Sequence, residues 1–211
     1  MNQSLNNKTR FIWTVVIILA LIGIAAAIRR ILIVENVISS YAPPKYPGFD
    51  SGFSRHRALT LLHIIPGSLF MITGPLLFFK KIQRNYINAF KWIKRSYFIC
   101  AYVVGISALA MSYTVSIGGA NETAATTFFA LFFLFSLTKA LIHTYNGNNV
   151  LYREWLLRSF AIGLAIATTR PIVGMFFALS SLSPHEFFGI AFWIAFTTHL
   201  VVVEGWIRHT R

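Results

Sequence analysis

The sequence predicts an all-α membrane protein, a polytopic transmembrane bundle of six helices with short interfacial helices in the inner loops. Three observations support this fold class. The 211 residues are 56% hydrophobic and only 12% charged, whereas a soluble domain has about 25% charged residues. Six apolar stretches each approach the length of about 20 residues that an α-helix needs to cross a bilayer. Finally, the segments between these stretches alternate in positive charge, as the loops of membrane proteins do.

We expect the six helices at residues 11–33, 58–79, 97–115, 123–143, 159–180 and 187–207. The first stretch has the basic start of a signal peptide, Lys8 and Arg10. Its apolar run is longer than a signal core, however, and no clean small-residue cleavage site follows Arg29 and Arg30. We therefore expect a retained helix. The single cysteine, Cys100, excludes an intrachain disulfide and a cysteine metal site. No soluble domain is predicted, so residues 1–211 form a single membrane domain.

The connecting segments differ in composition. The longest loop, 34–57, contains the proline-rich run Tyr41–Gly48, which either caps the outer mouth of the bundle or is an ordinary surface connection. Residues 80–96 alternate basic and aromatic side chains, which indicates an interfacial helix against anionic lipid headgroups, either as a generic anchor or as a specific lipid site. Residues 144–158 begin with an Asn-Gly turn signal, and we expect a second short interfacial helix after it.

The charge distribution predicts that both termini are cytoplasmic, because positive charge favours the inner side of a membrane. In this orientation the inner segments contain Lys8, Arg10, Lys80, Lys81, Arg84, Lys91, Lys94, Arg95, Arg153, Arg158, Arg208 and Arg211. The outer segments contain only Arg29, Arg30, Lys45, Arg55 and Arg57. The net charge of +13 therefore belongs to helix ends and short loops, and it does not indicate nucleic-acid binding.

Arg170 is the most informative polar residue in an apolar stretch. It lies about 11 residues into the fifth helix, near the expected midplane, and shares a face with Gly163 and Gly174. A charge at that depth costs about 2.5–3.5 kcal/mol on insertion scales, so it normally faces the bundle interior. We expect Arg170 to be buried against another helix and bonded to the hydroxyl of Thr168 or to the backbone carbonyl that Pro171 frees. It is either an anion clamp or a structural hydrogen-bonding node.

Two histidines are further candidates for ligand binding. His63 lies near the outer end of the second helix, with Gly67 and Gly74 on its face, and His199 lies nearer the middle of the sixth helix. Histidine is the usual axial ligand of b-type haem. The two residues differ by roughly 10 Å in depth, so the spacing disfavours a bis-histidine haem site and favours hydrogen-bonded interior histidines.

The remaining charges predict structural pairs. Lys139 and Glu204 lie at similar depth near the inner ends of the fourth and sixth helices, and we expect an ion pair between them, with Glu204–Arg208 as the local alternative. Arg158, at the entrance to the fifth helix, belongs to the same set of structural polar residues. No sequence motif of a hydrolase, a metalloprotease or a nucleotide-binding loop is present, so the sequence predicts no catalytic residue and no metal ligand.

Several segments match a pattern of bacterial membrane proteins: 55–67, Gly74-Pro75, 90–97, 153–160 and 167–170. In these segments the chain resembles the multi-pass proteins of domain-of-unknown-function family twenty-three-oh-six. The resemblance implies a membrane location, a helical bundle and no assigned activity. It gives weight to His63, Trp155, Arg158 and Arg170. Family members typically have His where this chain has Phe90 and Tyr152, which argues against a role that needs three histidines.

The sequence thus predicts a multi-pass protein of the inner (plasma) membrane with a polar interior site around Arg170 and His63, and with His199 as a third tentative ligand-binding residue. Three classes of function remain open. The first is a membrane subunit that binds a ligand or a quinone, or an accessory membrane subunit that binds a partner protein. The second is a small-solute transporter, which a water-accessible Arg170 and a helix broken at proline would favour. The third is a b-type haem redox protein.

Overall fold

The computed structural model describes residues 2–38 and 51–211, except for the side chains of residues 2–6 and 8. The helices in these ranges are α1 (Asn2–Val34), α2 (Ser51–Arg55), α3 (Arg57–Leu76), α4 (Lys80–Asn85), α5 (Ile87–Thr114), α6 (Gly119–Tyr145), α7 (Asn149–Leu179) and α8 (Pro184–Thr210). Six of them, all but α2 and α4, are long and apolar enough to cross a membrane. The predicted six-helix membrane fold is therefore confirmed. The proline-rich run Tyr41–Gly48 lies outside the described residues.

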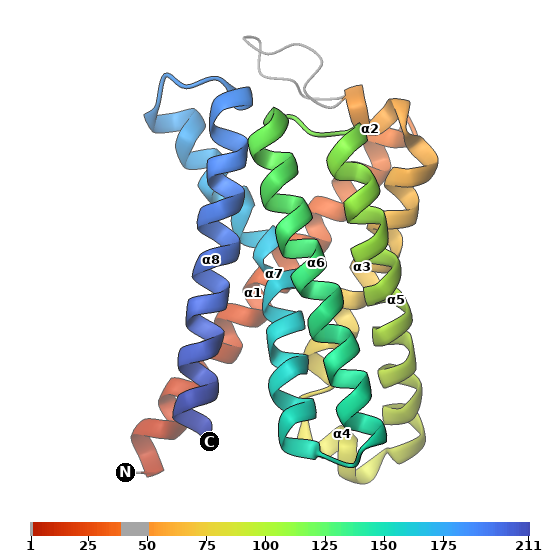
Figure 1. The fold of residues 1–211 in the computed structure, drawn as a ribbon, viewed down its shortest axis with the longest axis vertical. Coiled ribbons are helices and arrows are strands. Elements are labelled where there is room, and N and C mark those ends of the chain that lie inside the picture. The colour runs from red at the N-terminus through yellow and green to blue at the C-terminus, as the bar shows by residue number, and fades with distance from the viewer. Residues whose placement is uncertain (1, 39–50) are drawn as a thin grey trace.

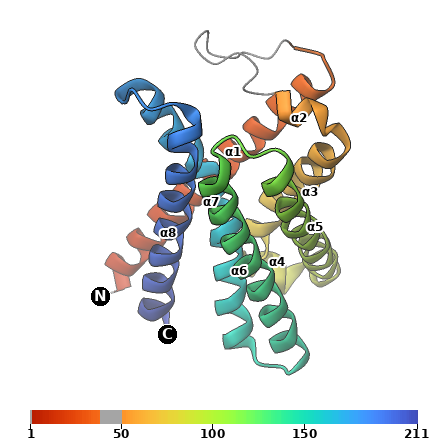
Figure 2. The same ribbon diagram turned by 45° about the horizontal axis from the view of Figure 1, so that its top comes forward.

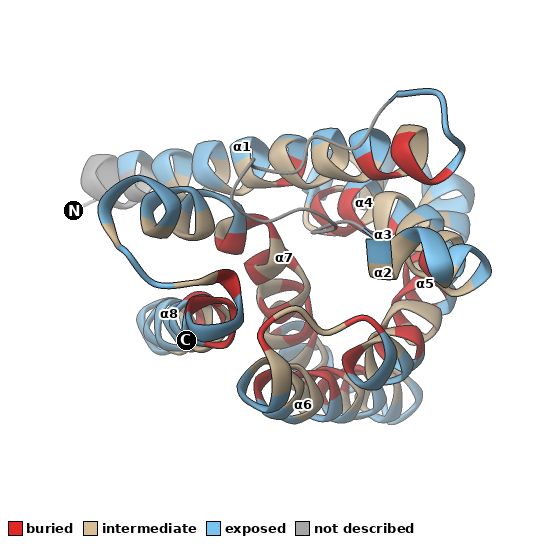
Figure 3. Ribbon diagram, turned by 90° about the horizontal axis from the view of Figure 1, so that it is seen from above, coloured by how far each residue is buried: buried red, intermediate tan, exposed pale blue. Residues whose placement is uncertain are grey.

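The long helices run side by side, and both termini lie at the same end of the bundle (Figure 1). We call this end the terminal end and the other the opposite end; α4 and the α6–α7 turn lie at the terminal end, and α2 at the opposite end. Figure 2 shows α6 and α7 between α8 on one side and α3 and α5 on the other. Figure 3 shows the bundle end-on, with α1, α3, α5, α6 and α7 around a common centre and α8 packed outside. Buried residues gather on the inward faces, and few residues of α1 are buried.

Two helices begin well before the apolar stretches that predict them. The amphipathic segment of the first inner loop is divided between the short helix α4 and the first turns of α5. In the second inner loop, the short helix that we expected is the beginning of α7, and the side chain of Asn148 caps this helix by accepting a 3.1 Å hydrogen bond from the backbone N–H of Leu151. Aromatic and basic side chains suit the membrane interface, so a transmembrane helix can continue through them.

The prolines of the membrane helices do not interrupt them. Pro66 and Pro75 lie inside α3, and Pro171 lies inside α7. A proline removes one backbone donor and normally kinks a helix, but both helices continue on either side. The broken helix that a transporter would favour is therefore not present among the described residues.

An aromatic cluster forms the middle of the bundle. The ring of Phe70 lies 5.0 Å from that of Tyr97, 5.7 Å from that of Phe133 and 5.8 Å from that of Phe160, measured between centroids. Two glycines make this packing possible, because a Cβ atom at Gly74 would overlap the ring of Phe160, and one at Gly163 would overlap the ring of Phe70. The rings thus join four transmembrane helices, and the hydroxyl of Tyr97 adds a polar contact with Ser159 on α7 at 3.1 Å.

The predicted packing role of Gly174 is wrong. A Cβ atom at this position would meet nothing within 4 Å, whereas Gly163 on the same face is tightly packed. The two glycines lie 11 residues apart, about 16 Å along α7 at 1.5 Å per residue, so the tight packing at Gly163 does not extend to Gly174. Near Gly174 it is the rings of Phe176 and Phe177 that contact α8, at Phe187.

An ion pair joins the ends of α1 and α3. Arg57 donates from Nε to Oε1 of Glu35 over 3.1 Å and from Nη2 to Oε2 over 2.7 Å. These hydrogen bonds stabilise the ionised carboxylate, so they hold the pKa of Glu35 below its ordinary value. The pair fixes where α3 begins relative to the end of α1.

Candidate functional site

A cavity of about 240 Å³ lies in the half of the bundle towards the opposite end, and α1, α3, α5, α6, α7 and α8 contribute to its wall. Its wall includes the aromatic rings of Phe70 and Phe133. Most of the wall is apolar. Four ionisable side chains also line it: Arg30, His63, Glu122 and Arg170. We regard this central cavity as the candidate functional site.

His63 is half-buried on α3 and is joined to α5 across the cavity wall. Its Nδ1 atom lies 2.9 Å from Oγ of the buried Ser107. Gly67, one turn further along α3, also lines the cavity, with Val104 at ordinary contact distance from a Cβ built there. The small residue leaves space beside the imidazole ring.

Arg30 is a site residue that the sequence analysis placed at the outer end of the first helix, without a role in the interior site. It lies inside α1, is 6% exposed, and its guanidinium carbon lies 3.8 Å from the ring centroid of Phe53 on α2. This is a cation–π contact. Thr60 donates a 2.9 Å hydrogen bond to the carbonyl of Phe53 and so holds the short helix in place. Because a charge near the end of a membrane helix is ordinary, no feature of the sequence singled out Arg30.

Glu122 is the second site residue that the sequence analysis missed, because it lies one residue before the expected start of its helix. Its Oε2 atom accepts hydrogen bonds from the backbone N–H groups of Ile117 (2.8 Å) and Gly118 (2.5 Å) and from the hydroxyl of Ser116 (3.2 Å). The carboxylate therefore orders the α5–α6 connection. The positive charge of Arg170 also acts on it, so α6 and α7 present opposite charges to the same cavity.

Arg170 lines the cavity, but the expectation that it is buried near the midplane is wrong. The side chain is exposed. Because α7 continues to Leu179, Arg170 lies only about two and a half turns from the end of the helix. Thr168, one of the acceptors expected for it, is instead bonded to His199 through Oγ1 and Nε2 at 2.8 Å. His199 does not line the cavity, so the structure brings together His63 and Arg170 but not all three candidates.

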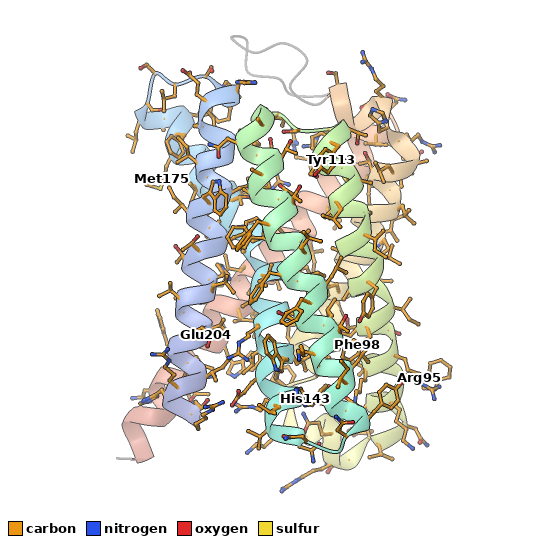
Figure 4. All side chains as sticks on the ribbon, viewed as in Figure 1. Arg95, Phe98, Tyr113, His143, Met175 and Glu204 are labelled. Atoms are coloured by element: carbon orange, nitrogen blue, oxygen red, sulfur yellow. The ribbon has the colours of Figure 1, made fainter. Side chains whose placement is uncertain are left out.

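A separate set of charges joins α7 and α8 near the terminal end. Arg158 donates from Nε and Nη2 to the two carboxylate oxygens of Glu204, over 2.5 and 3.0 Å. Its Nη1 atom also lies 3.9 Å from Glu154, and Arg211 makes a bidentate contact with the same buried Glu154 at 2.7 and 3.0 Å. Figure 4 shows Glu204 on the lower part of α8.

The predicted Lys139–Glu204 pair does not form. The Lys139 ammonium lies 5.6 Å from the ring centroid of Phe135 on its own helix, and Glu204 is bonded to Arg158 rather than to Lys139 or Arg208. A planar guanidinium matches both carboxylate oxygens at once, which an ammonium cannot do. Arg158 and Glu204 are therefore paired with each other.

The two positions at which the family resemblance implies histidine lie far from the cavity. Phe90 and Tyr152 are in the first turns of α5 and α7, which begin at the terminal end, whereas His63 lines the cavity towards the opposite end. Histidines at the three positions would not meet at one metal ion. Among the described residues, no group of three or more His, Cys, Asp or Glu side chains is placed to hold a metal.

Six apolar helices of membrane-spanning length define a polytopic α-helical membrane protein. A family described as predicted membrane protein (DUF2306) matches residues 60–207. The chain belongs to this family, which confirms the resemblance seen in its sequence. No curated protein and no solved structure matches the chain.

Proposed function

We propose that the protein binds a compact, mainly apolar ligand with oxygen substituents, of the quinone class, in the central cavity. One observation supports this above all: Arg30, His63 and Arg170 come from three different helices and line one largely apolar space. Binding sites for small molecules typically combine an apolar wall with a few polar groups that orient the ligand.

The polar groups of the cavity select the chemistry of the ligand. A guanidinium has five N–H donors and no acceptor, so Arg30 and Arg170 favour a ligand with carbonyl, hydroxyl or carboxylate oxygens. Charge-assisted hydrogen bonds of this kind are stronger than neutral ones. The apolar rings of Phe70 and Phe133 in the cavity wall favour a flat hydrophobic body.

The volume limits the size of the ligand. About 240 Å³ is below the range of about 300–1,000 Å³ that is common for drug-sized ligands. The cavity therefore suits one substituted ring or a headgroup, rather than a complete long-chain lipid.

Duroquinone, a compact tetramethylated quinone, is a suitable probe. Titration of the purified full-length protein by isothermal calorimetry should show saturable binding, and Arg170→Gln should weaken it by at least about tenfold, which is about 1.4 kcal/mol. His199→Gln is the matched control, because His199 is also a polar residue of a membrane helix but lies outside the cavity wall. The absence of binding, or equal affinity in the wild-type and Arg170→Gln proteins, would refute the proposal.

Transport of a small solute is a second candidate, favoured by the exposure of Arg170. The unbroken helices α3 and α7 argue against it, since many transporters place discontinuous helices at the substrate site. Proteoliposomes loaded with radiolabelled benzoate distinguish the two: a transporter exchanges the label with external benzoate, whereas a binding protein retains it.

We also propose that the terminal end faces the cytoplasm at the inner membrane and contacts anionic lipid headgroups. Exposed basic side chains gather on α4 and the first turns of α5, together with the exposed aromatic residues Tyr86 and Trp92. Anionic headgroups attract such a surface. The protein should unfold at a higher temperature in phosphatidylglycerol than in phosphatidylcholine nanodiscs, and the joint change Lys80→Gln and Lys81→Gln should reduce the difference. An equal unfolding temperature in both lipids would contradict this partner.

A further inference from the structure

Three hydroxyl groups of the cavity wall already donate their protons within the protein. Ser68, Ser112 and Thr169 each donate to a backbone carbonyl of their own helix, at 3.0, 2.8 and 2.7 Å. A hydroxyl has one proton and two lone pairs. These side chains therefore offer a ligand lone pairs and no proton.

The same argument assigns the proton of His63. We assign the Ser107 proton to the carbonyl of Val103, which lies 2.6 Å from its oxygen, so that this oxygen accepts from Nδ1 of His63 at 2.9 Å. The carbonyl of Val104 is a second acceptor beside this ring. Nδ1 therefore has the proton, and in the neutral imidazole Nε2 has a lone pair. Nε2 has no hydrogen-bond partner among the described residues.

The central cavity therefore presents donors from Arg30 on α1 and Arg170 on α7, and an imidazole acceptor from His63 on α3. We infer that its ligand has a hydroxyl group, as a quinol or a substituted phenol does, and that Nε2 of His63 accepts the hydrogen bond from this hydroxyl. The arginines donate to a second oxygen of the same ligand. This inference rests on the proposed function and names the hydroxyl-bearing form as the preferred one.

A quinone fits this arrangement less well than the corresponding quinol. Its two carbonyl oxygens only accept, so one of them faces the lone pair of Nε2 and leaves the imidazole nitrogen without a partner. Sites built to hydrogen-bond a substrate hydroxyl strongly reject analogues that lack it, because their own polar groups then stay unpaired. The two redox forms of one ring have nearly the same shape, so a difference in affinity between them reports the hydrogen bond.

The experiment compares duroquinol with duroquinone on the purified full-length protein, by anaerobic isothermal calorimetry. We expect the wild-type protein to bind duroquinol at least about tenfold more tightly than duroquinone. His63→Leu removes the acceptor, so the affinity for duroquinol should fall to that for duroquinone and the ratio should approach one. His199→Leu, which removes a hydrogen-bonded histidine outside the cavity wall, should leave the ratio unchanged.

The result can separate this inference from the proposed function. Equal affinities for duroquinol and duroquinone in the wild-type protein, weakened together by Arg170→Gln, would overturn the inference and leave the proposed function in place. Absence of binding by either form would overturn both. A preference for duroquinol that survives His63→Leu would overturn the role of His63. If His63→Leu does not fold, His63→Gln keeps an acceptor oxygen at the position, and we expect it to retain a preference for duroquinol.

Discussion

The pairing of Arg158 with Glu204 gives a quantitative prediction. Arg158→Met leaves two carboxylates near the terminal end without this guanidinium, because Arg158 contacts both Glu204 and Glu154. Removing one partner of a fully buried pair costs about 3–5 kcal/mol, whereas an exposed pair contributes about 0–1 kcal/mol. Arg158 is 14% and Glu204 40% exposed, so we expect an intermediate loss of about 2 kcal/mol in the free energy of unfolding.

A cysteine of the protein can be used to measure this loss of stability. Cys100 is the single cysteine and is buried in α5, so a fluorogenic maleimide labels it only when the bundle opens on heating in detergent. A loss of about 2 kcal/mol corresponds to a midpoint lower by about 4–8 °C for a chain of this length.

A double-mutant cycle tests whether Glu204 is the partner of Arg158, and not merely whether Arg158 contributes to stability. The pair Arg158→Met and Glu204→Gln should give a coupling energy of about 1–2 kcal/mol, since residues in one ion pair are not additive. The pair Lys139→Met and Glu204→Gln is the control, because these two side chains do not touch, and its coupling should stay below about 0.5 kcal/mol. Coupling of the control pair as large as that of the Arg158 pair would refute the reasoning.

Three further predictions concern packing, orientation and haem. Gly74→Val should destabilise the bundle by about 3 kcal/mol, since even one added carbon overlaps the buried ring of Phe160; Gly174→Val, in open space, is the control, and similar midpoints for both would contradict the packing described. Alkaline phosphatase fused after Arg211 should be inactive and after Ser181 active; the reverse pattern would invert the orientation. The purified protein should show no strong Soret band. Stoichiometric haem would instead favour the interpretation of the protein as a b-type haem redox protein.

The fold was predictable from the sequence because a bilayer imposes a simple rule on it. A span needs about 20 apolar residues whatever its neighbours are, so six apolar stretches indicate six helices. The ends of α5 and α7 were not predictable in this way. Their first turns, with Trp92 in one and Trp155 in the other, are rich in aromatic and basic residues and look like loops by hydropathy, although their backbones are helical.

The candidate site was only partly predictable, and the reasons are geometric. The depth of Arg170 was counted from the start of its apolar stretch, which placed the residue at the midplane. The helix α7 begins earlier, at Asn149, and the sequence does not reveal this. Arg30 and Glu122 lie close to helix ends, where a charge is ordinary in a membrane protein, and only the folded bundle shows that both line the cavity. The partner of Glu204 depends on how α6, α7 and α8 are rotated about their axes, which similar depth along the helices does not specify.

Because α1 is little buried, this one helix separates the cavity from the surrounding lipid. In the most apolar window of this helix only 6% of residues are buried, yet the helix contributes Gly23 and Arg30 to the cavity. Its span Thr9–Val34 is about 39 Å long at 1.5 Å per residue, longer than the hydrocarbon core of about 30 Å, and such a helix accommodates the mismatch by tilting. α1 is indeed inclined to the other helices (Figure 1). We expect a thicker bilayer to bring it more upright and to move Arg30 relative to α7, so that acyl-chain length would change the affinity for the proposed ligand.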